Sequence, residues 1–279
     1  MRVVVTSTIL ADLTDRIGGD AIELTGLLNP GDDPHVYEPV PQDTVALEQA
    51  DLILYNGYNL EPGLIRLMDG AGAQDRALAV GEVVTPLALE YEGQRQPDPH
   101  VWGDVENAIA MVNAIRDALI ELAPDQESLF TENARQLTEQ LTALDTWVEE
   151  QIATIPPAQR QLVTTHDAFQ YYANAYGLEI AGTLIGISTE EQPSAQTISR
   201  LVGAIQATGV PTIFAETTIN PALIQTVAAE AGVNLSPTPL YSDSIGAPGS
   251  DGDSYLKMIA ANTCAIATGL RGSCTPFEE

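Results

Sequence analysis

Histidine, cysteine and basic residues are scarce in this chain of 279 residues, and long apolar segments are missing. No apolar run approaches the roughly 20 residues of a transmembrane helix, so the sequence predicts no membrane-spanning helix. The chain has only 11 basic residues and 39 acidic ones, which gives a formal net charge of −28. Because nucleic-acid binding depends on Lys and Arg that neutralise phosphates, this balance excludes nucleic acid as a partner. It also disfavours binding to anionic lipid surfaces.

The N-terminus lacks the parts of a secretory signal, which are a charged n-region, an apolar h-region and a cleavage site. Met1 is followed at once by Arg2-Val3-Val4-Val5-Thr6, which is typical of a core strand. Two explanations stay open at this point. Either the protein is cytoplasmic, or a signal segment is absent from this sequence.

The two cysteines, Cys264 and Cys274, lie close together near the C-terminus, and no C-x₂-C metal spacing occurs. Gly269 and Gly272 between them indicate a turn. We expect a disulfide that closes a small loop and stabilises the fold by somewhat under ~3 kcal/mol. Such a bond implies an oxidising compartment. The alternative is two unrelated thiols, one of them buried on the last helix.

Strand-like and helix-like segments alternate in both halves of the chain, and the length suffices for one large core or two ordinary ones. Short apolar runs predict buried parallel strands at Val3–Thr6, Ile22–Leu28, Leu52–Tyr55, Ala77–Val80, Leu162–Thr165, Ile180–Ile185 and Thr212–Ala215. Helical spacing follows them at Ile9–Ile17, Gln42–Ala50, Asn59–Met68, Ala168–Tyr176, Ala195–Ala207 and Pro221–Ala231. The pattern predicts an α/β fold of two lobes, each a parallel sheet with flanking helices.

Between the two halves, residues 125–155 contain neither Gly nor Pro, and their apolar residues recur at three/four spacing. Pro124 suits a helix start, and Pro156-Pro157 end the helix abruptly. A helix of this length spans about 46 Å, longer than a small domain is wide. We therefore expect a rigid helix at 125–155 that bridges an N-terminal lobe, 1–124, and a C-terminal lobe, 156–279. A segment that pairs in a coiled coil is the alternative.

The three histidines of the chain all occur in contexts typical of metal ligands. Two share one phrase, Asp33-Pro34-His35-Val36-Tyr37 and Asp98-Pro99-His100-Val101-Trp102, and the third lies in Thr164-Thr165-His166-Asp167. Imidazole is the commonest protein ligand for zinc and several other transition metals. The proline before each of the first two histidines stiffens its loop. Asp33 or Asp98 can accept a ring N–H and so set the histidine tautomer.

Polar residues follow the predicted strands, at the sheet edge where ligands bind in open parallel sheets. His166 comes directly after Leu162–Thr165, and Glu216 directly after Thr212–Ala215. His35 lies in the loop after Ile22–Leu28, and Asp243 in a loop before the last helix. This placement predicts two ligands from each lobe and a metal in the cleft between the lobes.

Taken together, these motifs resemble the metal-binding solute receptors of ATP-driven importers for zinc, manganese and iron, the cluster A-I or TroA-like family. The resemblance covers essentially the whole chain and includes Thr6-Ser7-Thr8, the two Asp-Pro-His-Val phrases, Thr164–Phe169, Phe214-Ala215-Glu216 and Tyr241–Ser244. It implies His35, His100, His166 and Asp243 as the ligands, with Glu216 near the site but not a ligand. It also implies two α/β lobes joined by one long helix.

The same resemblance implies a monomeric receptor that delivers a metal ion to the membrane permease of an ABC importer. Members of the family are periplasmic or extracytoplasmic, in some cases through a lipid anchor on the precursor. The ion is cargo, and no catalytic cofactor is expected. Three imidazoles and one carboxylate bind zinc more tightly than manganese or ferrous iron. The stretch Val83–Pro97 lacks the histidine-rich loop of many zinc importers, which favours manganese or a broader specificity.

Two other functions could also use these histidines. A zinc-dependent hydrolase needs an open coordination position and a general base. The chain has no H-E-x-x-H motif, and Glu216 is its one candidate base. A receptor for an organic solute usually has arginines placed for its ligand, and arginine is scarce here. The sequence therefore predicts a metal receptor that is not an enzyme.

Overall fold

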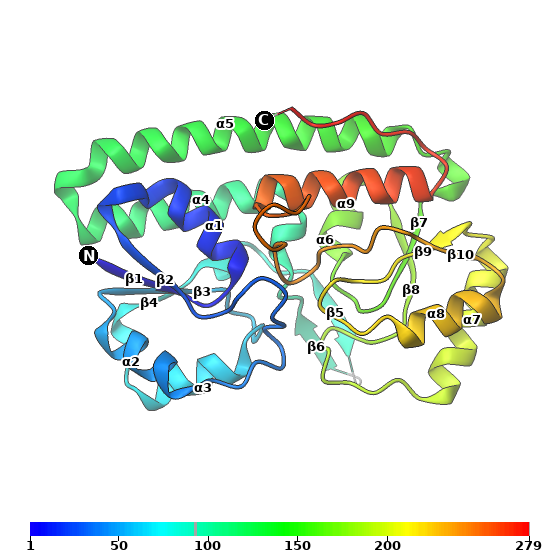
Figure 1. Cartoon of the computed structure of the whole chain (residues 1–279), viewed down its shortest axis with the longest axis horizontal. Helices are drawn as coiled ribbons and strands as arrows, with labels where there is room; N and C mark the ends of the chain where they lie inside the picture. Colours follow the sequence, from blue (N-terminus) through cyan, green and yellow to red (C-terminus); the bar gives the residue numbers. More distant parts are fainter. Residues whose placement is uncertain (92–93, 279) are drawn as a thin grey trace.

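The two halves of the chain form α/β layers that lie side by side beneath one long helix (Figure 1). The computed structural model describes residues 1–91 and 94–278. The parallel sheets with flanking helices confirm the predicted fold class. Each parallel pair brings the carboxyl ends of its strands to one edge, and loops at these edges carry His35 and His166.

The N-terminal half is built on a four-stranded parallel sheet with strand order β2-β1-β3-β4. Its strands are β1 (Arg2–Val5), β2 (Glu23–Gly26), β3 (Leu52–Tyr55) and β4 (Ala77–Ala79). Its helices are α1 (Thr8–Gly18), α2 (Pro41–Gln49), α3 (Pro62–Gly70) and α4 (Val105–Leu122). Val3, Val4 and Val5 are all buried, as expected of a central parallel strand covered on both faces.

A small antiparallel hairpin, β5 (Ala88–Tyr91) and β6 (Gln94–Pro97), lies outside the parallel sheets and was not predicted. The sequence of the second strand, Gln-Arg-Gln-Pro, has no apolar alternation to indicate a strand. This hairpin occupies the stretch before Asp98. Residues 92–93, which come between the two strands in the sequence, are outside the described part of the chain.

The predicted bridging helix is present as α5 (Glu127–Ala153), which extends across both halves of the molecule (Figure 1). A short 3-10 turn, Pro124–Gln126, precedes it. Its 27 residues span about 40 Å. The predicted apolar stripe is buried, at Leu137, Leu141, Leu144, Val148 and Ile152. These side chains join one hydrophobic core that includes strands of both halves, which makes the helix part of a common core. The exact lobe boundaries stay a prediction.

The C-terminal half consists of two parallel strand pairs. One pairs β7 (Gln161–Thr164) with β8 (Glu179–Thr183), and the other pairs β9 (Thr212–Ile213) with β10 (Asn234–Leu235). The Phe214 N–H donates to the Val163 carbonyl at 3.0 Å and links the two pairs. The helices are α6 (Gln170–Tyr176), α7 (Ala195–Thr208), α8 (Ala222–Ala231) and α9 (Tyr255–Gly269). The short β10 was not predicted.

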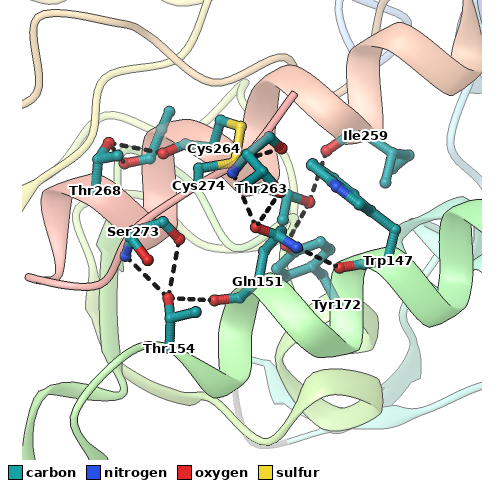
Figure 2. Close-up of a disulfide and its surroundings, with 12 residues drawn as sticks. Trp147, Gln151, Thr154, Tyr172, Ile259, Thr263, Cys264, Thr268, Ser273 and Cys274 are labelled. Atoms are coloured by element: carbon teal, nitrogen blue, oxygen red, sulfur yellow. Dashed lines mark hydrogen bonds between the residues drawn. A yellow bond between two sulfur atoms is a disulfide. The ribbon is translucent and has the colours of Figure 1, made fainter. Parts of the chain in front are cut away.

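Cys264 on α9 and Cys274 in the C-terminal tail form the predicted disulfide (Figure 2). Their Cα atoms are 5.2 Å apart, within the range that such a bond requires. The tail continues along α5, where the Ser273 N–H donates to Thr154 Oγ1 at 2.9 Å. The Thr275 N–H donates to Gln151 Oε1 at 3.0 Å. The disulfide therefore holds a tail that is also hydrogen-bonded to α5.

None of the helices formed by residues 1–91 and 94–278 has both the length and the apolarity to cross a membrane.

Candidate metal centre

The four predicted ligands, His35, His100, His166 and Asp243, converge at one buried point between the two halves. One nitrogen or oxygen atom of each lies within 4.8 Å of those of the others. His35 comes from the loop between β2 and α2, and His100 directly precedes the 3-10 turn Val101–Gly103. His166 follows β7, and Asp243 lies in the loop between β10 and α9. Loops that are distant in the sequence thus meet at this point.

The spacing of the atoms matches a coordination shell. His100 Nε2 lies 3.2 Å from His35 Nε2 and 3.4 Å from His166 Nε2. The edges of a tetrahedron around a metal with ligand distances of about 2.0–2.1 Å measure about 3.3–3.4 Å. All three histidines therefore present the same nitrogen, Nε2, at the separations that a shared ion requires.

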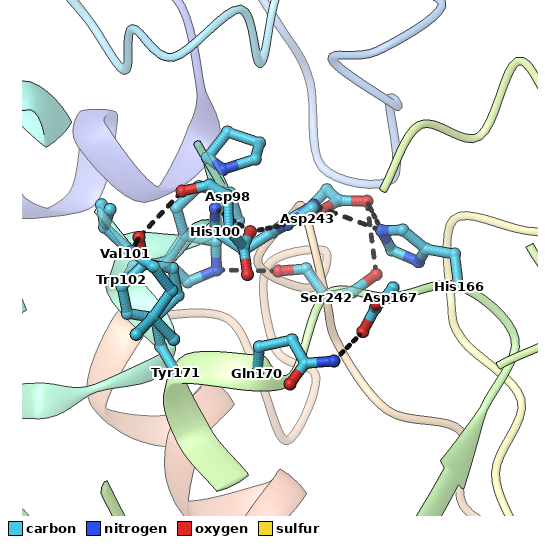
Figure 3. A network of polar contacts seen from close by, with 12 residues as sticks. Asp98, His100, Val101, Trp102, His166, Asp167, Gln170, Tyr171, Ser242 and Asp243 are labelled. Atoms are coloured by element: carbon cyan, nitrogen blue, oxygen red, sulfur yellow. Dashed lines mark hydrogen bonds and ion pairs between the residues drawn. The ribbon is translucent and has the colours of Figure 1, made fainter. Parts of the chain in front are cut away.

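The carboxylate of Asp243 lies between two of the histidines (Figure 3). Asp243 Oδ1 is 3.4 Å from His100 Nε2, and Asp243 Oδ2 is 3.3 Å from His166 Nε2. Oδ1 is buried and has no hydrogen-bond partner among the described residues. Both oxygens face the histidines, which is the orientation that bidentate coordination requires.

His100 is oriented by Asp98, which lies two residues before it. Asp98 Oδ1 is 2.7 Å from His100 Nδ1 and accepts the His100 backbone N–H at 3.0 Å. A carboxylate at Nδ1 places the proton there and leaves the lone pair of Nε2 free for a metal. Asp98 thus has the acceptor role that the sequence suggested for Asp33 or Asp98.

His166 is oriented in the same way by Glu216, which follows β9. Glu216 Oε2 bonds His166 Nδ1, and Glu216 Oε1 accepts the His166 backbone N–H at 2.8 Å. Both carboxylate oxygens are therefore used to hold the histidine. Glu216 is outside the cluster of converging ligand atoms, and its contact with Nδ1 is one that the sequence did not predict.

Asp33 does not have this role toward the ring of His35. Its Oδ1 accepts the His35 backbone N–H at 2.9 Å, and its Oδ2 accepts a hydrogen bond from Thr189 Oγ1 at 2.7 Å. Thr189 belongs to the C-terminal half. Asp33 therefore connects the His35 loop to the opposite side of the cleft.

Burial and neighbouring charges give the histidines different pKa values. Burial lowers the pKa of His100, but the nearby Asp98 and Asp243 outweigh it and raise the pKa to about 9. Burial likewise lowers the pKa of His166, while Glu216 and Asp243 raise it well above the usual value. For His35 burial dominates, and the pKa falls to about 3.

The pKa of Asp243 also reflects two opposing effects. Burial raises it, but the charges of His166 and His100 and their hydrogen bonds hold it well below the usual value. The carboxylate is therefore ionised, as a metal ligand must be. A divalent cation that binds here replaces the protons of His100 and His166 as the partner of this buried charge.

Two residues that the sequence did not single out as site residues hold the loop of His100. Asn56 Nδ2 donates to the Pro99 carbonyl at 2.9 Å, and Tyr171 Oη donates to the Asp98 carbonyl at 2.9 Å. Asn56 directly follows β3 at the carboxyl edge of the parallel sheet. The strand-end rule that placed the other site residues would also have identified Asn56.

The Asp243 loop is hydrogen-bonded to the N-terminal half, although it belongs to the C-terminal half of the sequence. Ser244 Oγ accepts the Gly31 N–H at 2.8 Å, and the Ile245 N–H donates to Thr8 Oγ1 at 3.0 Å. Trp102 Nε1 donates to the Ser242 carbonyl at 3.0 Å. The loop of Asp243 is thus hydrogen-bonded to the half that carries His35 and His100, and also to α9 of its own half, where the Tyr241 N–H donates to Asn262 Oδ1 at 2.8 Å. The division of two ligands per lobe stays a prediction.

Two α/β layers joined by a long helix, with three histidines and an aspartate between them, define a class of binding protein with a metal site in its cleft. The sequence profile of the family described as zinc-uptake complex component A, periplasmic, matches residues 3–269. The chain belongs to this family.

Relatives and solved structures agree with this assignment over nearly the whole chain. The manganese-binding lipoprotein MntA of Halalkalibacterium halodurans is 33% identical over 97% of this chain and 88% of its own length. The metal ABC transporter substrate-binding lipoprotein FimA of Streptococcus parasanguinis is 36% identical over 97% and 89%. The periplasmic zinc-binding protein TroA of Treponema pallidum superposes with a TM-score of 0.91 at 33% identity, covering 96% and 98% of the two chains.

Proposed function

We propose that this protein captures a divalent transition metal in its cleft and delivers the ion to the membrane permease of an ABC importer. His35, His100, His166 and Asp243 are the proposed ligands. The observation that carries the proposal is the convergence of three Nε2 atoms and one carboxylate at coordination spacing. Carboxylates at Nδ1 of His100 and His166 further prepare these two side chains for a metal.

The related proteins support the transport role and its location. Relatives that match nearly the whole chain are named as metal or manganese lipoproteins, several of them as substrate-binding components of ABC transporters. The matching family is described as periplasmic. We therefore propose a periplasmic or extracytoplasmic location, where the disulfide between Cys264 and Cys274 is stable. We propose that the receptor acts as a monomer.

We propose manganese as the physiological cargo, with zinc as the tighter competitor and ferrous iron as a further candidate. By the ordinary affinity order, a site of three imidazoles and one carboxylate holds zinc more firmly than manganese. The two oxygens of Asp243 that face the histidines support five-coordination, which accommodates manganese. Metal supply then decides which ion is carried.

Two features support a receptor over the alternatives. A hydrolase would need Glu216 as its general base, but both oxygens of Glu216 are bonded to His166. An organic solute would need space among the ligands, whose atoms lie within 4.8 Å of one another. We therefore propose that the protein has no catalytic activity.

Elemental analysis of the protein purified from its native compartment tests the cargo, and competition between zinc and manganese then ranks the two ions. Calorimetry on metal-stripped His166→Ala tests the ligands. We expect this variant to bind metal at least about tenfold more weakly while its thermal unfolding curve keeps one cooperative transition. Unchanged affinity would show that His166 is not a ligand. Steady turnover of generic ester or peptide substrates by the metal-loaded protein would revive the hydrolase interpretation.

A further inference from the structure

The proposed metal centre is closed to solvent, so an ion needs a route to it. His100 and His166 are 0% exposed, Asp243 is 1% exposed and His35 is 4% exposed. A cavity of about 710 Å³ lies directly over His35, and His35 is the one proposed ligand among the residues that line it. The ligand with the largest exposure therefore faces the cavity.

The two halves of the chain form opposite walls of this cavity. Tyr58, Glu82 and Pro99 belong to the wall of the N-terminal half. The other wall is the segment 187–191 of the C-terminal half, of which Ile187, Ser188, Glu190 and Glu191 line the cavity. The cavity is thus a passage between the halves with His35 at its inner end.

The charges along this passage favour a cation. Glu82, Glu190 and Glu191 line it together with one basic residue, Arg66. Glu191 Oε1 is buried and has no hydrogen-bond partner among the described residues. Carboxylates around a concave passage raise the local concentration of cations and their rate of association.

The segment 187–191 is fastened to the N-terminal half through Thr189, the one residue of the segment that does not line the cavity. Thr189 Oγ1 donates to Asp33 Oδ2 at 2.7 Å, and Asp33 Oδ1 in turn accepts the His35 backbone N–H. Among the hydrogen bonds formed by residues 1–88 and 95–278, this is the only one between the segment and the N-terminal half. One bond thus ties the wall of the passage to the loop of the ligand at its inner end.

We propose that the cavity over His35 is the route by which the metal enters and leaves, and that the bond between Thr189 and Asp33 keeps the segment 187–191 closed over it. This proposal rests on the proposed metal-binding function. When the bond opens, the segment moves away from His35 and exposes the first ligand that an incoming ion meets. The bond therefore controls the rates of exchange and has little effect on the equilibrium affinity, because Thr189 is not a ligand.

Thr189→Val tests the closing bond, because valine keeps the shape of threonine and removes the hydroxyl. Stopped-flow mixing with Zn²⁺ gives the association rate, and competition with a chelator gives the dissociation rate. We expect both rates to rise by about five- to tenfold, the factor that one lost hydrogen bond contributes. Thr189→Ser keeps the hydroxyl and is expected to exchange metal as the wild type does. Wild-type rates in Thr189→Val, or the same acceleration in both variants, would overturn the role of the bond.

Glu190→Gln combined with Glu191→Gln tests the route. We expect the association rate at low ionic strength to fall at least about threefold and the difference to vanish at high salt, with the dissociation rate unchanged. The matched control is Glu149→Gln combined with Glu150→Gln, which removes the same charge from exposed positions of α5. An equal loss in the control would show that only net charge matters and would overturn the route. Wild-type protein that binds neither Zn²⁺ nor Mn²⁺ would refute the proposed function itself.

Discussion

The two Asp-Pro-His-Val phrases of the chain share one backbone hydrogen bond, but their aspartates make different side-chain contacts. In both, the aspartate accepts the backbone N–H of the histidine two residues on, at 2.9 Å for Asp33 and His35 and at 3.0 Å for Asp98 and His100. Asp98 also bonds the ring of its histidine at Nδ1. Asp33 instead bonds Thr189 across the cleft. The same local turn therefore orients one ring and fastens the other loop to the opposite half.

The two histidines also differ in burial and in their neighbours. His100 is fully buried, and its Nε2 lies within 3.4 Å of His35, His166 and Asp243. His35 faces the cavity. A repeated motif fixes the local backbone, while the neighbours that the fold supplies decide what each copy does.

The largest expected effect comes from removing the two rings in turn. His100→Ala is expected to weaken metal binding at least about a hundredfold, beyond the loss usual for a residue that only orients a ligand. His35→Ala is expected to lose about tenfold, because its ring has only His100 among its close ligand neighbours. Chelator competition measures both affinities, with thermal unfolding as the control for the fold. An equal or larger loss in His35→Ala would remove the distinction between the two copies.

The pH dependence of binding sharpens the same comparison. Metal binding needs neutral imidazoles, and the pKa of His100 is raised to about 9, whereas that of His35 is lowered to about 3. His100 therefore releases a proton on binding throughout pH 6–8, and His35 releases none. Each released proton makes affinity fall about tenfold per pH unit as pH decreases. Calorimetry in buffers of different ionisation enthalpy counts the protons, and His35→Ala is expected to leave the count unchanged.

The aspartates of the two phrases are expected to respond differently to neutralisation. Asp98→Asn removes the charge that orients His100 and is expected to weaken equilibrium binding about tenfold. Asp33→Asn does not change any contact of the His35 ring, so metal affinity is expected to fall by less than about threefold. Titration of metal-stripped protein against a competing chelator measures both. Equal losses would mean that the ring contact of Asp98 has no special role.

A smaller effect than that of Asp98→Asn is expected from a residue that supports the backbone of the second phrase. Asn56→Ala removes the hydrogen bond to the Pro99 carbonyl and is expected to weaken binding by about threefold to fivefold, the contribution of one neutral hydrogen bond. Asn113→Ala is the matched control, because Asn113 donates to the Ile109 carbonyl within α4. The visible absorption of bound Co²⁺ should shift in Asn56→Ala and stay unchanged in the control. The same spectrum in both variants would show that Asn56 does not position His100.

The sequence predicted the elements whose local pattern is strong. β3 was predicted residue for residue, and α5 lies within the predicted 125–155 because its apolar residues from Leu137 to Ile152 keep helical spacing. The hairpin β5–β6 and the short β10 were not predicted. Their few residues lack apolar alternation or length, and contacts with the rest of the fold decide their pairing.

The candidate site likewise contains residues that the local sequence predicts and contacts that only the fold determines. Three histidines, two of them in one repeated phrase, indicate a metal centre from the sequence alone, because imidazole chemistry and backbone stiffness are local properties. The carboxylate that orients each ring depends on distance in space. Asp98 is two residues from His100 and was suggested by the sequence, whereas the Glu216 contact with His166 spans 50 residues.

The sequence by itself therefore determined the ligand types, the α/β alternation, the long helix and the acidic surface, since all of these follow from local pattern and composition. Only the tertiary structure decided that Asp33 bonds Thr189 while Asp98 bonds a ring, and that the Asp243 loop is also hydrogen-bonded to the N-terminal half. Such pairings join segments up to 237 residues apart. Their geometry depends on how the whole core packs, so a local sequence motif does not determine these pairings.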